Sequence, residues 1–163
     1  MSNRARIAAV AVVVLAGLQI MRPRGTNPPV DPAARLEAQG PVPAPVLATL
    51  RRGCYDCHSN ETRWPWYTGV IPAAWLVVSD VEKGRGQLNW SRWRDYNVYD
   101  RADLLDKACD MTTKKRMPLG PYLWLHGDAS LMKLLDELLA AFVAQLRMKL
   151  PGTTYKPCYR LVA

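Results

Sequence analysis

Residues 54–58 read Cys-Tyr-Asp-Cys-His, a C-x-x-C-H pattern that constrains this chain more than any other feature. Two thiols at this spacing lie one helical turn apart and can reach the two vinyl groups of one porphyrin. The imidazole of the next residue can then lie beneath the iron. The pattern therefore predicts one covalent haem c, attached through Cys54 and Cys57, with His58 as an iron ligand.

Two other interpretations of the cysteine pair fit less well. A thioredoxin-like redox pair requires a βαβ context, which the sequence does not predict. A structural zinc site requires a second pair of ligands at suitable spacing, whereas Cys109, His126 and Cys158 are scattered along the chain.

Methionine and histidine are the usual ligands on the opposite face of the iron in electron-transfer cytochromes. Met117 is the best placed candidate, because it lies in Lys-Arg-Met-Pro-Leu-Gly-Pro, where two prolines and a glycine stiffen the loop. We therefore predict Met117 as the second ligand, and an open position as one alternative.

Other methionines and one histidine are weaker candidates for the second ligand. Met111 ends a predicted helix, while Met132 and Met148 lie in the last predicted helix and are expected in its core. His126 would be a stronger ligand than methionine, but a hydrogen bond to the backbone or to a haem propionate is the role we favour for it.

The N-terminus carries an apolar run from Ile7 to Met21, preceded by a basic stretch. At about 1.5 Å per residue the run reaches about 22 Å, short of a hydrocarbon core of about 30 Å, although flanking arginines can extend the span. A cleaved signal ending at Ala16 would leave a brief apolar region, so we favour an uncleaved, single-pass anchor in the inner membrane. Because haem c is attached outside the cytoplasm, the rest of the chain is expected on the periplasmic side.

The net charge of +8 raises the possibility of an anionic partner. Arginines that flank the apolar run supply half of this excess, and no basic helix or aromatic nucleic-acid motif is present. We therefore expect no nucleic-acid binding.

The chain divides into four segments. Residues 1–24 form the anchor, 25–45 a proline-rich linker, 46–150 the haem-binding domain and 151–163 a C-terminal tail. The linker composition favours a semi-rigid, extended spacer. An irregular arm lying on the domain surface is the alternative.

The domain is predicted to be helical. Val46 and Leu50, with Leu47, share one face of a short helix that leads into Cys54. A second helix is expected to start at Pro72 and stop at Gly84, since these residues favour helix starts and ends.

Two further helices follow. Asp100 can cap a helix that runs to about Met111. A long helix is expected after Asp128 and Ser130, because leucines recur at helical spacing from Leu131 to Leu146. No segment alternates with period two, so we predict an all-α, cytochrome c-like domain around a single haem.

Aromatic residues are unusually frequent for a small domain, and flat rings suit packing around a porphyrin. Trp64, Trp66 and Tyr67 are the best candidates for haem contacts because they closely follow the histidine. Core packing is the alternative for all of the aromatic residues, which also include Trp75, Trp90, Trp93 and Trp124, and we expect only a minority to contact haem.

Basic residues precede both predicted iron ligands: Arg51, Arg52, Lys114, Lys115 and Arg116. They could guide docking to an acidic redox partner, or they could be solvated or pair with the propionates. Cys109 and Cys158 could form a disulfide, since the expected compartment is oxidising, although Cys109 could equally be a buried apolar residue.

The sequence resembles the haem-binding domain family of bacterial exported, cytochrome c-like proteins over about residues 47–140. This resemblance implies one covalent haem c, held by the cysteines and histidine named above, with Met117 as the distal ligand. The sequence departs from the family pattern at Ala74, at Trp90 and after Leu150. The matching stretches are Cys54–Thr62, Trp64–Tyr67, Pro72–Leu76, Asp80–Val81, Gly84–Arg85, Leu88–Ser91, Met117–Leu119, Tyr122 and Leu125–His126.

The expected function is one-electron transfer at the membrane, as a free carrier or as a subunit of a respiratory or photosynthetic complex. A haem enzyme or gas sensor with a labile sixth ligand is the alternative. No acid, base or nucleophile constellation in the sequence supports other chemistry.

Overall fold

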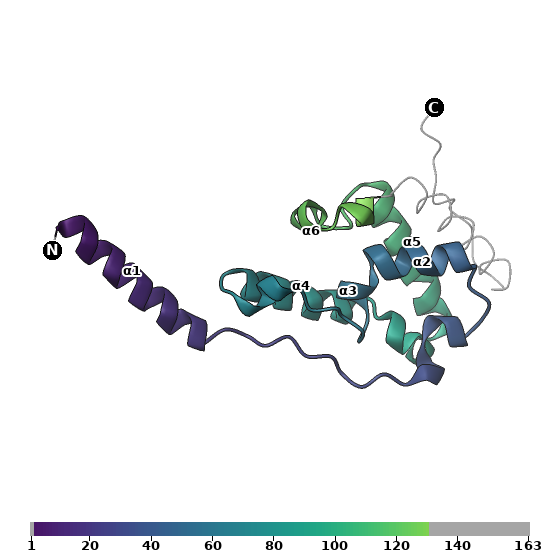
Figure 1. Ribbon diagram of the computed structural model, residues 1–163. Helices are drawn as coiled ribbons and strands as arrows, with labels where there is room; N and C mark the ends of the chain where they lie inside the picture. Colours follow the sequence, from purple (N-terminus) through teal and green to yellow (C-terminus); the bar gives the residue numbers. More distant parts are fainter. Residues whose placement is uncertain (1, 131–163) are drawn as a thin grey trace, which may run out of the picture.

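The computed structural model describes residues 2–130, which fold entirely into helices and connecting loops (Figure 1). Within this range no β-strand occurs, so the all-α prediction is confirmed. The long helix predicted from Leu131 onward lies outside the described residues.

The α-helices are α1 Asn3–Ile20, α2 Ala44–Gly53, α3 Tyr55–His58, α4 Ala73–Gln87, α5 Val98–Thr113 and α6 Gly120–Leu125. The 3-10 helices are η1 Pro32–Ala34, η2 Leu36–Ala38, η3 Trp66–Gly69, η4 Trp90–Asp95 and η5 Gly127–Ser130.

Helix α1 projects away from the rest of the chain (Figure 1). The Ser2 hydroxyl caps it by accepting a hydrogen bond from the Ala5 N–H. None of its residues is buried, and in length and composition it is the one helix among the described residues that could cross a membrane.

The proline-rich segment between α1 and α2 lies along the surface of the helical body, as in the second of the two expectations for it. The side chain of Asn27 donates to the Thr62 carbonyl, and Asn60 donates to the Pro29 carbonyl. Leu36 from η2 is buried in the core. The segment is therefore tied to the domain by both hydrogen bonds and apolar packing.

The core forms where α2 and α5 meet η4. Val46 and Leu50 of α2 are buried as predicted, and Leu105 of α5 joins them. Trp90 and Trp93 of η4 lie within the same cluster with ring centroids 5.3 Å apart. Full burial of one such side chain contributes about 1.5–3 kcal/mol, so this cluster anchors the elements that carry the C-x-x-C-H turn.

Two predicted helix ends were wrong. Helix α5 is capped by the Asn97 side chain, which accepts from the N–H groups of Tyr99 and Asp100, so Asp100 lies in the first turn instead of at the cap. Helix α4 follows Pro72 as expected but continues through Gly84 to Gln87. A helix can continue through glycine at a cost of about 1 kcal/mol, and at Gly84 packing explains the glycine.

Candidate haem-attachment site

The two cysteines of the C-x-x-C-H turn lie at the junction of α2 and α3. Cys54 caps the C-terminus of α2, with its N–H donating to the Leu50 carbonyl, and its own carbonyl accepts from the N–H groups of Cys57 and His58 at 3.2 and 2.8 Å. Both cysteines are half-buried free thiols. The turn therefore presents two reduced sulfur atoms and one imidazole within a single helical turn.

The imidazole of His58 is oriented by α4. Its Nδ1 lies 3.0 Å from the Gly84 carbonyl oxygen and 3.1 Å from that of Leu88. Carbonyl oxygens only accept hydrogen bonds, so Nδ1 carries the proton and the lone pair of Nε2 is left for a metal. A backbone partner on one ring nitrogen is the usual support for a histidine that ligates metal through the other. Burial lowers the pKa of His58, although the hydrogen bonds to the Leu88 and Gly84 carbonyls oppose this, and the lowered pKa favours the neutral ring.

Gly84 allows α4 to approach the turn closely. A Cβ atom added at this position would lie 2.5 Å from the Cys57 carbonyl oxygen and 3.2 Å from the Cys57 Cβ. Gly84 thus both permits the contact and supplies a carbonyl acceptor for His58. This packing accounts for the glycine inside α4.

The thiols of the turn are not activated. Burial raises the pKa of Cys54 to about 12, with a further contribution from the neighbouring Cys57. Burial, and then the charges of Asp56 and Asp80, raise the pKa of Cys57 to about 11. Redox-active C-x-x-C pairs have a lowered thiol pKa, so this pair differs from a thioredoxin-like one.

A buried polar network holds the residues that follow the turn. The Asn60 N–H donates to the Ser91 hydroxyl, and the Asn89 side chain donates to the Asn60 side-chain oxygen at 2.8 Å. Ser91 N–H in turn donates to Asn89 Oδ1. These groups satisfy one another inside the protein, which fixes the chain after His58 against η4.

Arg85 links the same region to the proline-rich segment. Its guanidinium donates to the Ser59 carbonyl, the Thr62 hydroxyl, the Thr26 carbonyl and the Asn27 side chain. The resemblance included Arg85, but no role for it could be predicted from the sequence, because its partners are far away along the chain.

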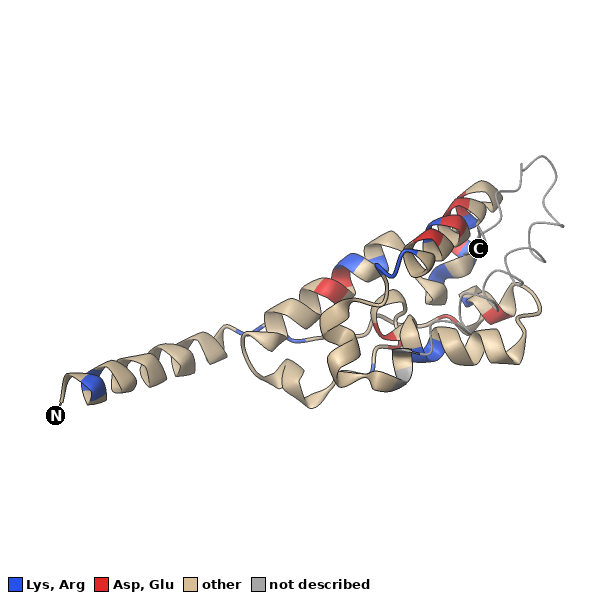
Figure 2. Cartoon of the chain, turned by 90° about the horizontal axis from the view of Figure 1, so that it is seen from above, with Lys and Arg blue, Asp and Glu red and all other residues tan. Residues whose placement is uncertain are grey.

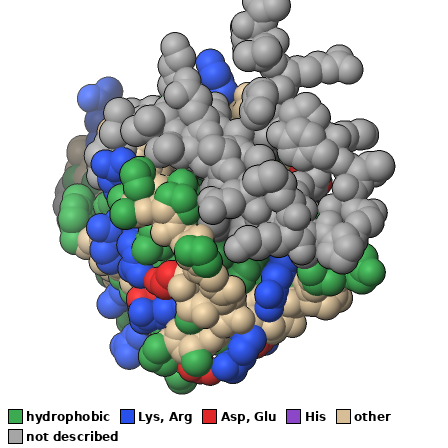
Figure 3. Space-filling view, turned by 90° about the vertical axis from the view of Figure 1, so that its right-hand side faces the viewer, with side chains coloured by type: hydrophobic (Ala, Val, Ile, Leu, Met, Phe, Trp, Pro, Cys, Tyr) green, Lys and Arg blue, Asp and Glu red, His purple; other side chains and the backbone are tan. Residues whose placement is uncertain are grey.

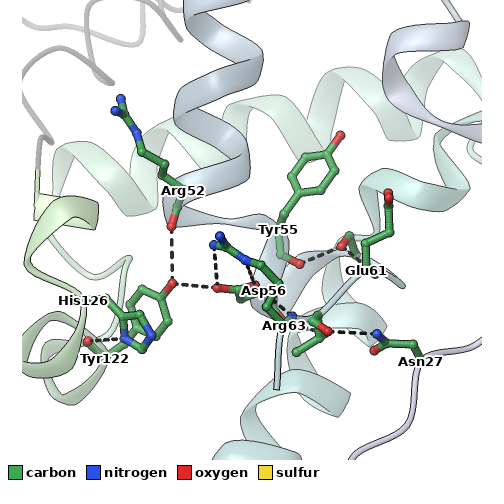
Figure 4. A network of polar contacts seen from close by, with 10 residues as sticks. Asn27, Arg52, Tyr55, Asp56, Glu61, Arg63, Tyr122 and His126 are labelled. Carbon is green, nitrogen blue, oxygen red and sulfur yellow. Dashed lines mark hydrogen bonds and ion pairs between the residues drawn. The ribbon is translucent and has the colours of Figure 1, made fainter. Parts of the chain in front are cut away.

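Asp56, between the two cysteines, connects the turn to α6. Figure 4 shows the Tyr122 hydroxyl between the Arg52 carbonyl and the Asp56 carboxylate. The Tyr122 oxygen lies 3.3 Å from the former and 3.1 Å from the latter, and Arg63 pairs with the same carboxylate at 3.2 Å. Burial, and then the charge of Asp56, raise the pKa of Tyr122. Sequence reasoning assigned no role to Tyr122 or Asp56.

His126 stacks on Tyr122, with ring centroids 4.0 Å apart and an angle of 7° between the rings. Its Nδ1 lies 3.0 Å from the Tyr122 carbonyl oxygen, which is the backbone hydrogen bond that the sequence led us to favour. Tyr67 meets the His126 ring edge-on at 6.5 Å. The pKa of Tyr67 is raised by burial and by the nearby Asp56 and Cys57. Tyr67 and Tyr122 therefore both lie close to the turn.

Met117 lies in the loop between α5 and α6 and is half-buried. Its N–H donates to the Met111 carbonyl at 3.2 Å, which folds the loop back on the end of α5. The next residue, Pro118, is buried and is the nearest neighbour of Gly53, at 3.8 Å from a Cβ built there. The loop therefore packs beside the residue that precedes Cys54.

The other predicted aromatic residues separate into three groups. Trp90 and Trp93 belong to the core, as the alternative interpretation held. Trp64 packs on Gly25, and its indole N–H donates to the Asn27 side chain. Trp66 and Trp124 are each 83% exposed, and Trp75 is also exposed.

Part of the basic charge is already paired within the chain. Arg51 pairs with Glu37 at 2.7 Å and lies over the Tyr55 ring, and Lys114 pairs with Asp110 at 2.7 Å. Cys109 is buried and disulfide-bonded, and the partner predicted for it, Cys158, lies outside the described residues.

The donor set of this turn fits an iron porphyrin. Two thiols can add to vinyl groups, and an imidazole with its Nδ1 proton fixed can bind iron through Nε2. Among residues 2–130, no group of three or more His, Cys, Asp or Glu side chains is arranged to hold a bare metal ion.

Comparison with known proteins supports haem binding. Residues 13–145 match the family described as haem-binding domain. The chain is also 55% identical over 141 residues to a protein named pyrimidine/purine nucleotide 5'-monophosphate nucleosidase from Escherichia coli (strain K12), and equally to those of strains O6:H1 CFT073 and O157:H7. The alignment covers 81% of this chain but only 30% of each relative, and the nucleosidase name describes those longer proteins. No solved structure matches the chain. Because the family match extends over most of the sequence, this protein belongs to the haem-binding domain family.

Proposed function

We propose that this chain is a membrane-anchored, mono-haem c-type cytochrome that transfers one electron at a time on the periplasmic side of the inner membrane. The observation that carries the proposal is the fixed orientation of His58: its Nδ1 is hydrogen-bonded to the Gly84 carbonyl of α4 and to the carbonyl of Leu88, which follows α4, so Nε2 is left for iron. Belonging to a haem-binding family supports it independently.

Covalent attachment is supported by the state of the cysteines. Cys54 and Cys57 are free, half-buried and one helical turn apart, so neither sulfur is committed to a disulfide. In our proposal each thiol adds across one vinyl group of the porphyrin, the thiol proton going to the vinyl carbon, which gives two thioethers without any oxidant.

Met117 is our proposed second iron ligand. The loop of Met117 packs beside Gly53, which immediately precedes the attachment turn. Helix α6 follows this loop, and its Tyr122 hydroxyl donates a hydrogen bond to the Asp56 carboxylate. Thioether sulfur is a usual partner of histidine in electron-transfer haem proteins. Trp64, Trp66 and Tyr67 are proposed as haem contacts, of which Tyr67 has the strongest support because it lies near Cys57 and Asp56.

A bound haem would supply an iron that accepts and releases one electron. The role of the chain is then to hold the ligands still, since no bond forms or breaks in the transfer. The two carbonyl bonds to His58 and the buried Asn60, Asn89 and Ser91 network restrict movement on one side of the porphyrin. Helix α1 is apolar and long enough to keep the carrier at the membrane, near a redox partner or complex.

Optical spectra of the full chain, purified from a host that installs haem c, test the proposal. The oxidised protein should show the weak long-wavelength band of methionine sulfur bound to ferric iron. Met117→Ala should abolish this band, whereas the matched control Met111→Ala should keep it. Rapid binding of carbon monoxide by the reduced wild-type protein would instead support a haem enzyme or sensor, and a bis-histidine spectrum would contradict the Met117 assignment.

A further inference from the structure

An exposed apolar surface lies at the end of the body where α1 joins it. Val70, Trp75 and Leu76 are 50%, 41% and 65% exposed, and we call these three residues the end patch. Trp75 and Leu76 are consecutive residues of α4, and the Val70 carbonyl accepts from the Ala74 N–H, which keeps Val70 next to the first turn of that helix. Large apolar side chains gathered on one surface mark an interaction site more often than isolated ones do.

Hydrogen bonds connect the loop that contains Val70 to the last turn of α1. The Gln19 side chain donates to the Gly69 carbonyl at 2.5 Å and accepts from the Ile71 N–H at 3.2 Å. These two bonds hold the loop that contains Val70 against the end of the helix. Beside them Ile20 and Met21 are also largely exposed, so the apolar surface continues from α1 onto the body.

The short length of the apolar run places this junction within the membrane interface. The run from Ile7 to Met21 reaches about 22 Å, whereas the hydrocarbon core is about 30 Å thick. If the arginines before Ile7 lie in the headgroups of the inner leaflet, the other end of α1 lies at or below the outer headgroups. The loop bonded to Gln19 must then lie at the same depth.

Charge is distributed as this placement requires. No Asp, Glu, Lys or Arg occurs from Trp64 to Ser79, and charged residues in α4 begin only at Asp80. In Figure 2 the ribbon of α4 is tan at its end nearest α1, and the colours of charged residues begin farther along the helix. On the face that points away from α1, Lys and Arg side chains are scattered over the described part (Figure 3).

We propose that the end patch inserts into the outer interface of the phospholipid bilayer beside α1, so that the domain lies against the membrane instead of swinging on a flexible tether. This inference rests on the proposed anchoring by α1. Tryptophan favours the interface, where its ring is in apolar surroundings and its N–H can meet headgroups or water, which suits Trp75. Insertion would fix the orientation of the C-x-x-C-H turn relative to the membrane.

Nitroxide labels on the full-length protein in vesicles of phosphatidylcholine and phosphatidylglycerol test this placement. Leu76→Cys probes the end patch, and Lys83→Cys is the matched control, exposed on the same face of α4 two turns later. Val13→Cys reports on α1. Collisions with oxygen, which concentrates in lipid, are compared with collisions with a water-soluble nickel chelate.

We expect the label at residue 76 to meet oxygen several-fold more often than nickel, and the label at residue 83 to show the reverse. Equal exposure of both labels to nickel, with the label at residue 13 in lipid, would overturn this inference and leave the anchor intact. A label at residue 76 shielded from both probes would also overturn it, since protein and not lipid would then cover the patch. A label at residue 13 exposed to nickel would overturn the anchoring itself.

Wild-type protein without added cysteine should take up no label. Uptake by the wild-type protein would contradict covalent haem attachment and would not affect the inference about the end patch.

Discussion

The C-x-x-C-H turn is supported on one side by α4 and on the other by α6, and the two supports differ in kind. On the α4 side, two carbonyls accept from His58, and Gly84 lies so close that a Cβ atom would overlap the Cys57 carbonyl. On the α6 side, the Tyr122 hydroxyl contacts the Asp56 carboxylate, and the loop of half-buried Met117 contributes Pro118, which packs beside Gly53.

This difference suggests a division of roles. Backbone contacts at van der Waals distance tolerate little change, so the α4 side restricts the position of His58, the iron ligand in our proposal. The part-buried side-chain contacts of Tyr122 can adjust more readily, so we expect the α6 side to tolerate more change than the α4 side. We expect substitutions on the α4 side to cost more stability than those on the α6 side.

The largest effect is expected at Gly84. Gly84→Ala places a methyl group 2.5 Å from a backbone oxygen, and such overpacking costs about 1–3 kcal/mol or more. Gly86→Ala is the matched control, because a Cβ there meets nothing within 4 Å and alanine is the better helix former by up to about 1 kcal/mol. Urea unfolding of the full chain in detergent measures both. Equal stability of the two variants would contradict the tight approach of α4.

The next largest effect is expected at Asn60. Asn60→Ala removes the oxygen that accepts from Asn89 and leaves a buried donor without its partner, which costs about 1–3 kcal/mol. Gln87→Ala, at an exposed position at the end of α4, should change the free energy of unfolding by less than about 0.5 kcal/mol. If both variants lowered the free energy of unfolding by similar amounts, the network of Asn60, Asn89 and Ser91 would not support the turn.

A smaller effect is expected at Tyr122 on the α6 side. Tyr122→Phe keeps the stacking on His126 but loses the one O–H donor that the Asp56 carboxylate and the Arg52 carbonyl share, at a cost of about 0.5–1.5 kcal/mol. The same unfolding measurement applies. If Tyr122→Phe lowered the free energy of unfolding more than Gly84→Ala does, the proposed division between the two sides would be reversed.

The smallest effect is expected at Arg63. The Arg63 side chain is 72% exposed, although that of Asp56 is only 13% exposed, and an ion pair whose cation is open to solvent contributes about 0–1 kcal/mol. Arg63→Gln should therefore barely change thermal stability, and raising the salt concentration should reduce the difference further. A decrease in stability comparable to that of Asn60→Ala would show that the ion pair of Arg63 and Asp56 stabilises the protein more than its exposed geometry indicates.

The sequence allowed correct prediction of features that depend on local patterns. The helix before Cys54, its buried Val46 and Leu50, and the all-α class follow from residue spacing within a few turns. The apolar helix α1 follows from composition alone.

The features that could not be predicted depend on residues far apart in the chain. Gly84 has the local signature of a helix end, but its packing partner Cys57 lies in another helix. The second acceptor for His58, the Leu88 carbonyl, lies 30 residues away, and Asp56 meets Tyr122 across 66 residues. No short-range pattern encodes such contacts.

The central claim is that one haem is bonded to Cys54 and Cys57. The most direct measurement is the intact mass of the full chain, matured in a host that installs haem c and then extracted with acid acetone. We predict a mass greater than that of the chain by one haem, with the added mass on the proteolytic peptide that contains residues 54–58. A chain of unmodified mass, with its pigment in the acetone, would contradict the account.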